Sequence, residues 1–264
     1  MNHVASYLDV QADDLCLQWL SSQSSGAQHS DIISNRSRDT GRWFLESPEY
    51  KKWLFGKQET LFCPGIPGAG KTMIMAIAID DLISRYHQDY SIGICFVYYS
   101  FRRQEGHDLE ALLATLLRQL SGRCSSVPDV VKRLYDKHRQ PGTRPTYDEL
   151  NLALSEVLRS FDRVYLMIDA LDEYLPDGDP RSLPTTLMQL QSSNAQLNLM
   201  ATSRHVPEIM SVFESSPSLE ISAASEDLEE YLNSNMTKFP VAIQKDKELH
   251  HEIRDVLIST CHGM

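Results

Sequence analysis

The segment Gly65–Thr72 has the sequence GIPGAGKT, which fits the pattern G-x-x-x-x-G-K-[ST]. Its glycines let the backbone adopt turns in which consecutive N–H groups point at phosphate oxygens. Lys71 supplies an ammonium for the outer phosphates, and the Thr72 hydroxyl can ligate Mg²⁺. The alternative is a glycine-rich turn that fits the pattern by accident. The residues predicted to contact a nucleotide are Gly65, Pro67, Gly68, Ala69, Gly70, Lys71 and Thr72.

The residues on both sides of this segment favour the phosphate-loop interpretation. Glu59–Cys63 is a short apolar, β-prone run of the kind found in buried parallel strands. Downstream, apolar residues from Met73 to Ile83 predict a helix with a broad apolar face. A phosphate loop must follow a strand and open a helix, and both neighbours are therefore in the required order.

From Thr60 onward, strand and helix signals alternate, as a parallel sheet with crossover helices requires. The further predicted strands are Ile92–Tyr99, Val164–Ile168, Leu197–Thr202 and a short fifth, Leu219–Ile221. The intervening predicted helices are Asp108–Leu120, Pro128–His138 and Tyr147–Phe161. The fold class predicted is α/β: a P-loop NTPase three-layer sandwich with a five-stranded, mainly parallel sheet.

The two ends of the chain predict helical additions to this core. Residues 4–20 suggest a short helix, and the polar stretch Ser21–Ser30 suggests a linker. We therefore divide the chain into a helical lead-in and linker over 1–57, the core over 58–222, and the incomplete start of a helical subdomain over 223–264.

Local signals support both additions. In the lead-in, Ser47-Pro48-Glu49 reads as N-cap, first-position proline and first-turn acid. The aromatic residues around this cap are expected to pack the lead-in onto the core, or alternatively to place one ring near a nucleotide base: Trp43, Phe44, Tyr50 and Trp53. In the last segment, helices are predicted over Glu226–Met236 and Asp246–Thr260.

Composition limits the classes of partner. A formal net charge of −11 over 264 residues argues against a nucleic-acid groove. The five cysteines form no C-x-x-C pair, which is typical of reduced thiols. The first residues lack the features of a secretory signal, and no apolar run reaches the roughly 18 residues that span a bilayer. We therefore expect a cytoplasmic protein without a membrane segment.

A carboxylate ends the predicted strand at Asp169. In P-loop enzymes an aspartate in this place holds Mg²⁺, usually through water. The alternative is an aspartate that caps the next turn. Asp172 and Glu173 follow, and one of them could orient or deprotonate the water that attacks the γ-phosphate. The alternative for this pair is a solvated acidic loop.

The predicted strand at Leu197–Thr202 continues into Ser203 and Arg204. If this strand lies between the phosphate-loop strand and the Asp169 strand, Arg204 emerges beside the γ-phosphate and could sense its presence. The alternative is a solvated arginine. No N-K-x-D element that would read guanine is present, so the sequence favours ATP over GTP.

Three of these motifs resemble a known family when taken together. GIPGAGKT at Gly65–Thr72, DALDE at Asp169–Glu173 and TSR at Thr202–Arg204 look like the NACHT-type P-loop domain of fungal NOD-like receptors. Together with the segment from Thr40 to Tyr50, they are also similar to the nephrocystin-3-like N-terminal domain. The resemblance covers residues 30–264 and suggests a chain truncated after its nucleotide-binding core.

The resemblance implies a cytoplasmic, signal-transducing NTPase of innate immunity, with homo-oligomer or NOD-like receptor partners. It implies that the Arg204 strand separates the Gly65 and Asp169 strands. Lys71 matches the phosphate-binding position, and Thr72 and Asp169 match the Mg²⁺ positions. Asp172 or Glu173 matches the catalytic acid, and Arg204 matches the sensor.

Three functions remain open at this level. A slow ATPase acting as a conformational switch uses all of the matched residues. A fragment that binds nucleotide without turnover would use the phosphate loop alone. A small-molecule phosphotransferase would also need an acceptor pocket and a lid, and the sequence between Asp108 and Phe161 shows no lid signature.

Overall fold

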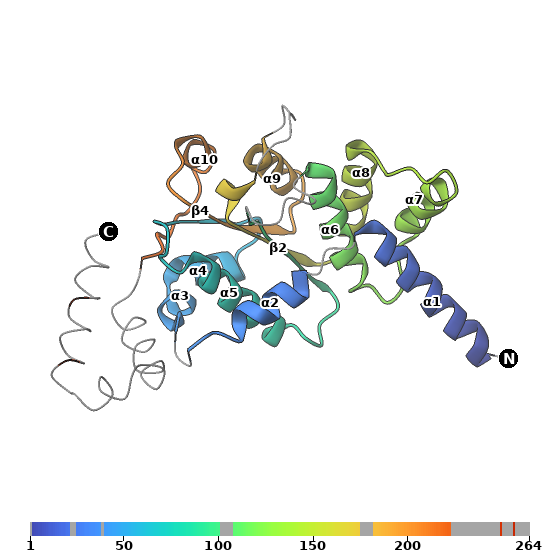
Figure 1. Ribbon diagram of the computed structural model, residues 1–264, viewed down its shortest axis with the longest axis horizontal. Helices are drawn as coiled ribbons and strands as arrows, with labels where there is room; N and C mark the ends of the chain where they lie inside the picture. Colours follow the sequence, from blue (N-terminus) through green and yellow to red (C-terminus); the bar gives the residue numbers. More distant parts are fainter. Residues whose placement is uncertain are drawn as a thin grey trace.

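Four parallel strands form the sheet at the centre of the described part of this computed structural model (Figure 1). The structure describes residues 2–21, 25–37, 40–100, 108–174 and 182–222 and the single positions 249 and 256, with side chains from residue 11 onward. The strands are β1 (Thr60–Pro64), β2 (Ile92–Tyr98), β3 (Arg163–Asp169) and β4 (Leu197–Ser203). Their order across the sheet is β1-β4-β3-β2, and every neighbouring pair is parallel.

Helices cover both faces of this sheet (Figure 1). One face carries α2 (Ser25–Ile33), α3 (Arg42–Glu46), α4 (Pro48–Phe55) and α5 (Lys71–Arg85). The other face carries α6 (Leu109–Ser121), α7 (Asp129–Arg139), α8 (Tyr147–Leu158), α9 (Leu183–Ser192) and α10 (Pro207–Val212), with α1 (Asn2–Leu20) packed against α6 and α7. The three-layer α/β sandwich predicted from the alternating signals is therefore confirmed.

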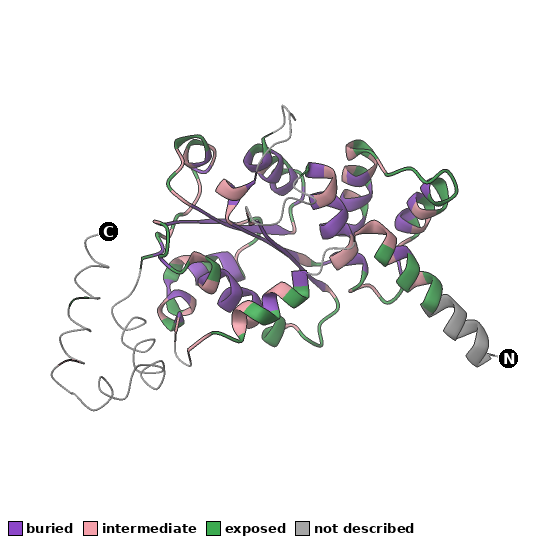
Figure 2. Ribbon diagram, in the orientation of Figure 1, coloured by how far each residue is buried: buried purple, intermediate pink, exposed green. Residues whose placement is uncertain are grey.

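The strands are buried on both faces, as Figure 2 shows for the sheet as a whole. Val164, Leu166 and Ile168 of β3 join the apolar cluster on the α6 side, whereas Tyr165 and Met167 join the cluster on the α5 side. Successive side chains of a strand point to opposite faces, so a continuous apolar run is what a sheet covered by helices on both sides requires.

The predicted fifth strand, Leu219–Ile221, is wrong as a strand of the sheet, which has four strands among the described residues. The segment nevertheless runs along the outer edge of β1. The Leu219 N–H donates to the Phe62 carbonyl (3.0 Å), and the Ile221 N–H donates to the Pro64 carbonyl (2.7 Å). Only one bridge forms, between Phe62 and Ser218. Pro217 before that bridge and Pro64 of β1, opposite the segment after it, have no N–H, so the pairing does not extend into a ladder on either side.

The predicted polar linker Ser21–Ser30 is also wrong in part, because α2 begins at Ser25. Within it, His29 is buried, and its Nδ1 lies 2.9 Å from the hydroxyl oxygen of Tyr98 on β2. Ile32 packs against the cluster on the α5 side. The helix is therefore stabilised by tertiary contacts that a polar composition does not reveal.

The lead-in aromatic residues pack onto the core as expected, with Phe44, Tyr50 and Trp53 almost fully buried. Ser47 caps α4, because its hydroxyl accepts the Tyr50 N–H at 3.1 Å. The indole of Trp53 donates to the Leu199 carbonyl at 2.9 Å, which ties α4 to β4.

Two predictions concern features beyond this core. The helices predicted over Glu226–Met236 and Asp246–Thr260 lie outside the described ranges, apart from positions 249 and 256. Across the described residues, no helix combines the length and the apolar character that crossing a membrane requires.

Candidate nucleotide-binding site

The predicted phosphate loop connects the end of β1 to the start of α5. Gly68 and Gly70 have φ angles of 81° and 91°, in the left-handed region that glycine adopts readily. A Cβ atom added at either glycine would meet open space, so the backbone conformation is what favours glycine there. The N–H groups of the first turn of α5 have no partners within the helix and are available to an anion.

Gly65 is constrained for a different reason. A Cβ atom at this position would lie 2.4 Å from the Ile221 carbonyl oxygen, so only glycine fits between β1 and the segment beside it. The Gly65 N–H also donates to the Ser203 carbonyl at the end of β4 (3.1 Å). The first residue of the loop is therefore held from both sides.

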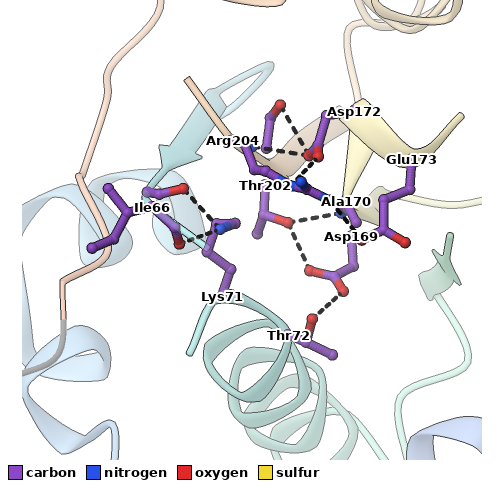
Figure 3. A network of polar contacts seen from close by, with 11 residues as sticks. Ile66, Lys71, Thr72, Asp169, Ala170, Asp172, Glu173, Thr202 and Arg204 are labelled. Atoms are coloured by element: carbon purple, nitrogen blue, oxygen red, sulfur yellow. Dashed lines mark hydrogen bonds and ion pairs between the residues drawn. The ribbon is translucent and has the colours of Figure 1, made fainter. Parts of the chain in front are cut away.

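Lys71, the first residue of α5, folds its side chain back over the loop (Figure 3). Its ammonium donates to the carbonyl oxygens of Gly65 and Ile66, both at 2.8 Å. Burial lowers the pKa of Lys71, and the negative charges of Asp172 and Asp169 act in the opposite direction. The cation thus lies beside the loop and within the field of the acidic residues.

Thr72 and Asp169 meet across the gap between α5 and β3. The Thr72 hydroxyl donates to Oδ2 of Asp169 at 2.7 Å, and the Asp169 side chain is almost completely buried. Burial raises the pKa of Asp169, and hydrogen bonds from Thr202 and Thr72 work against that shift. A hydroxyl and a carboxylate side by side are hard oxygen donors, which suit Mg²⁺ when phosphate and water complete its coordination.

Thr202, at the end of β4, belongs to the site, although the sequence alone gave it no role there. Its hydroxyl donates to Oδ1 of Asp169 at 2.6 Å and accepts the Ala170 N–H at 2.9 Å (Figure 3). One feature of the sequence could have indicated its role. A residue with a hydroxyl ends the predicted strand at Leu197–Thr202, and a carboxylate ends the predicted strand that precedes it in the chain. Using that feature requires knowing that the two strands are adjacent.

Asp172 and Glu173 lie in a short 3₁₀ turn after β3 and face Arg204 (Figure 3). Nε of Arg204 lies 2.8 Å from Oδ2 of Asp172, and its backbone N–H donates to Oδ1 at 2.9 Å. The contact from Arg204 to Glu173 is longer, at 3.4 Å. The Asp172 side chain is 6% exposed and that of Glu173 is 24% exposed, so Glu173 is the more accessible acid.

The predicted site residues converge because β4 lies between β1 and β3, as the resemblance implied. The carboxyl ends of parallel strands meet at one edge of the sheet, so the loop after β1 and the residues that end β3 and β4 face each other. Among the described residues, no group of three or more His, Cys, Asp or Glu side chains forms a separate metal site.

Comparison with known proteins relates this geometry to a family. The family model described as "Nephrocystin 3, N-terminal" matches residues 39–204. Vegetative incompatibility protein HET-E-1 of Podospora anserina is 24% identical over an alignment of 242 residues that covers 86% of this chain. The chain spans only 17% of the length of that relative.

Similar solved structures include two distant ones. The ORC1 protein of Aeropyrum pernix, in complex with DNA, has a TM-score of 0.47 at 15% identity over 76% of this chain and 50% of its own. A Walker-type ATPase of Pyrococcus abyssi has a TM-score of 0.48 at 13% identity over 83% of this chain and 63% of its own.

The family match carries the assignment, since it covers more than half of the chain. It includes the phosphate loop, the D-A-L-D-E segment and the T-S-R end of β4. The chain therefore belongs to the Nephrocystin 3 N-terminal family and carries a NACHT-like P-loop domain.

Proposed function

We propose that this chain binds a nucleoside triphosphate with Mg²⁺, prefers ATP, hydrolyses it slowly and acts as a signal-transducing switch. One observation carries the proposal. At one edge of the sheet, Lys71 lies beside the phosphate loop and Thr72 is hydrogen-bonded to Asp169. The fold and the family support nucleotide binding, and the absence of N-K-x-D from the sequence supports the preference for ATP.

Each side chain has a role that its position supports. The loop amides and the Lys71 ammonium would bind the phosphates. Thr72 and Asp169 would hold Mg²⁺, which supplies neutralisation of phosphate charge when bound. Glu173, partly exposed beside Arg204, is the better candidate to orient or deprotonate water, because Asp172 is engaged by two donors of Arg204 at shorter distances. The Arg204 guanidinium is placed to respond to an added anion.

Calorimetric titration with ATP, ADP and GTP, with and without Mg²⁺, tests binding. Lys71→Ala removes a charge-assisted bond worth about 1.5–3 kcal/mol, so affinity for ATP should fall roughly ten- to a hundredfold. Lys51→Ala, which removes an exposed lysine from α4, is the matched control and should bind like wild type. Unchanged affinity in Lys71→Ala would reject the proposed phosphate site.

A nucleotide-binding domain without turnover is the second candidate function. The contacts of Arg204 with Asp172 (2.8 Å) and Glu173 (3.4 Å) support it, because they engage both acids that could activate water. Single-turnover hydrolysis of labelled ATP separates the candidates. We expect slow release of phosphate from wild type and at least a hundredfold slower release from Glu173→Gln, within the range that general-base catalysis contributes. No release from wild type would favour the second candidate.

The switch role rests on the relative rather than on the site. HET-E-1 is named as a vegetative incompatibility protein of a fungus, which supports a signalling role of innate-immunity type in the cytoplasm, with homo-oligomer or NOD-like receptor partners. Light scattering after size exclusion, with ADP and with a slowly hydrolysed ATP analogue, tests it. A mass that depends on the nucleotide supports a switch that assembles, whereas the same monomeric mass in both states would contradict it.

A further inference from the structure

The end of β4 contacts the D-A-L-D-E segment residue by residue. Thr202 bonds to Asp169 and Ala170, at the beginning of that segment. The Ser203 hydroxyl lies 3.3 Å from Oδ1 of Asp172, and Arg204 reaches the same carboxylate. The last two residues of β4 and the residue that follows them therefore hold successive parts of the neighbouring acidic segment.

We propose that Thr202 is a positioning residue that orients the Asp169 carboxylate toward Thr72. This inference rests on the proposed function, because it concerns the two residues that would hold Mg²⁺. Thr202 holds Oδ1 at 2.6 Å, and Oδ2 is thereby directed to the Thr72 hydroxyl at 2.7 Å. A carboxylate held at one oxygen cannot rotate freely, so its other oxygen keeps a fixed direction.

The direction of the Thr202 hydrogen bond follows from its second contact. The hydroxyl oxygen accepts the Ala170 N–H, which leaves its single proton for Asp169. Thr202 is fully buried and Asp169 almost so, which leaves little room for water to replace either contact. Partners of this kind, which orient a metal-binding group without touching the metal, typically change metal affinity or activity ten- to a hundredfold when removed.

Thr202 also holds the turn that follows Asp169. Ala170 has φ 58° and ψ 57°, a left-handed conformation that residues other than glycine rarely adopt. The bond from its N–H to Thr202 stabilises that conformation. The turn leads directly into the 3₁₀ segment with Asp172 and Glu173, so the same hydroxyl contributes to the placement of both acids.

The test is the effect of Mg²⁺ on nucleotide affinity, measured by calorimetry as the ratio of the dissociation constants without and with the metal. Thr202→Val keeps the shape and removes the hydroxyl, and the ratio should fall about ten- to a hundredfold. The affinity without Mg²⁺ should stay within about twofold, because the loop and Lys71 are untouched. Thr202→Ser restores the donor and should restore the ratio.

Two further variants keep the result interpretable. Thr186→Val, at a buried threonine of α9 that is not one of the hydrogen-bond partners of Asp169, should leave the ratio unchanged even if it lowers the melting temperature. If Thr202→Val does not fold, Thr202→Cys replaces it in the test, because a thiol is a weaker donor of similar size. The ratio of dissociation constants for Thr202→Cys should then be lower than that for Thr202→Ser.

The possible failures are distinct. If Thr202→Val, or Thr202→Cys where it replaces that variant, has the wild-type ratio, the positioning role is overturned. The proposed function is then unaffected. An equal loss of affinity with and without Mg²⁺ also overturns it, because that result indicates general damage to the loop. A wild-type chain whose nucleotide binding shows no dependence on Mg²⁺ overturns both the positioning role and the proposed magnesium site.

Discussion

Both ends of the sheet carry buried polar side chains, but the partners of those side chains differ. At the amino end, Asn198 of β4 donates to the carbonyls of Trp53 (2.6 Å) and Gly56 (3.0 Å) and accepts the Glu59 N–H (3.1 Å). The Tyr165 hydroxyl donates to the Leu54 carbonyl at 2.7 Å. Most partners there are backbone groups, although the Tyr165 hydroxyl also accepts from Nη1 of Arg163 at 3.2 Å. The network fastens the end of α4 and the approach to β1.

At the carboxyl end, charged groups form the network. Lys71 and Arg204 supply the cations, and Asp169, Asp172 and Glu173 supply the carboxylates. Hydrogen bonds to backbone groups satisfy the buried polar atoms within the fold. Charged side chains can instead exchange their partners within the protein for contacts with a charged ligand. We infer that the amino end serves stability and that the carboxyl end serves binding, so substitutions should separate the two properties.

The largest effect is expected at the amino end. Trp53→Ala removes an almost fully buried indole and its bond to the Leu199 carbonyl, and should cost about 3–5 kcal/mol in the free energy of unfolding. Urea denaturation measures this loss. Nucleotide affinity of the folded fraction should not change. Phe55→Ala, two residues later and 62% exposed, is the control and should cost less than about 1 kcal/mol. A large loss of affinity in Trp53→Ala would break the distinction between the two ends.

The next effect is expected at the carboxyl end, from Asp169→Asn. The amide oxygen can still accept from Thr202, while the amide nitrogen faces Thr72, where the proposed Mg²⁺ would need an oxygen ligand. The gain in nucleotide affinity from Mg²⁺ should therefore fall about ten- to a hundredfold by calorimetry. Stability should hold or rise at neutral pH, because an ionised carboxylate is no longer buried.

The pH dependence of this variant provides the check. Burial raises the pKa of Asp169 in the folded state. The contribution of this group to the free energy of unfolding is therefore fully present below the usual carboxyl pKa. It is lost as the pH rises through the raised pKa of the folded state. Asp169→Asn should therefore gain stability relative to wild type at neutral pH, and the gain should vanish in acid below the usual carboxyl pKa. Equal differences in stability at both pH values would contradict this account of the buried carboxylate.

Part of this arrangement could be predicted from sequence because it is local. The residues Gly65–Thr72 by themselves predict a turn and the start of a helix. Asp169 comes immediately after an apolar run that predicts a strand. Parallel strands end at the same edge, so side chains at their carboxyl ends were expected to converge. These features need only the order of neighbouring residues and the direction of the strands.

The rest depends on contacts between distant segments. Thr202 and Asp169 are 33 positions apart, and their bond exists only because β3 and β4 are neighbours. The helix at Ser25–Ile33 has a polar composition and is stabilised by packing on β2 and α5. The edge segment Leu219–Ile221 has strand-like residues, but the isolated bridge to β1 forms at Ser218, just before it. Local composition carries none of this information.

The smallest effect tests for strain in the turn that follows Asp169, at the carboxyl end of the sheet. Ala170→Gly removes the cost of an L-residue in a left-handed conformation, about 1–2 kcal/mol, and adds about 0.5–1 kcal/mol of backbone entropy in the unfolded chain. The net gain in unfolding free energy should be about 0–1.5 kcal/mol, measured from urea midpoints. The control is Ala12→Gly, at an exposed position inside α1, which should lose about 1 kcal/mol. If both glycine variants lose stability equally, the turn after Asp169 carries no strain, and the carboxyl end differs from the amino end in its charges alone.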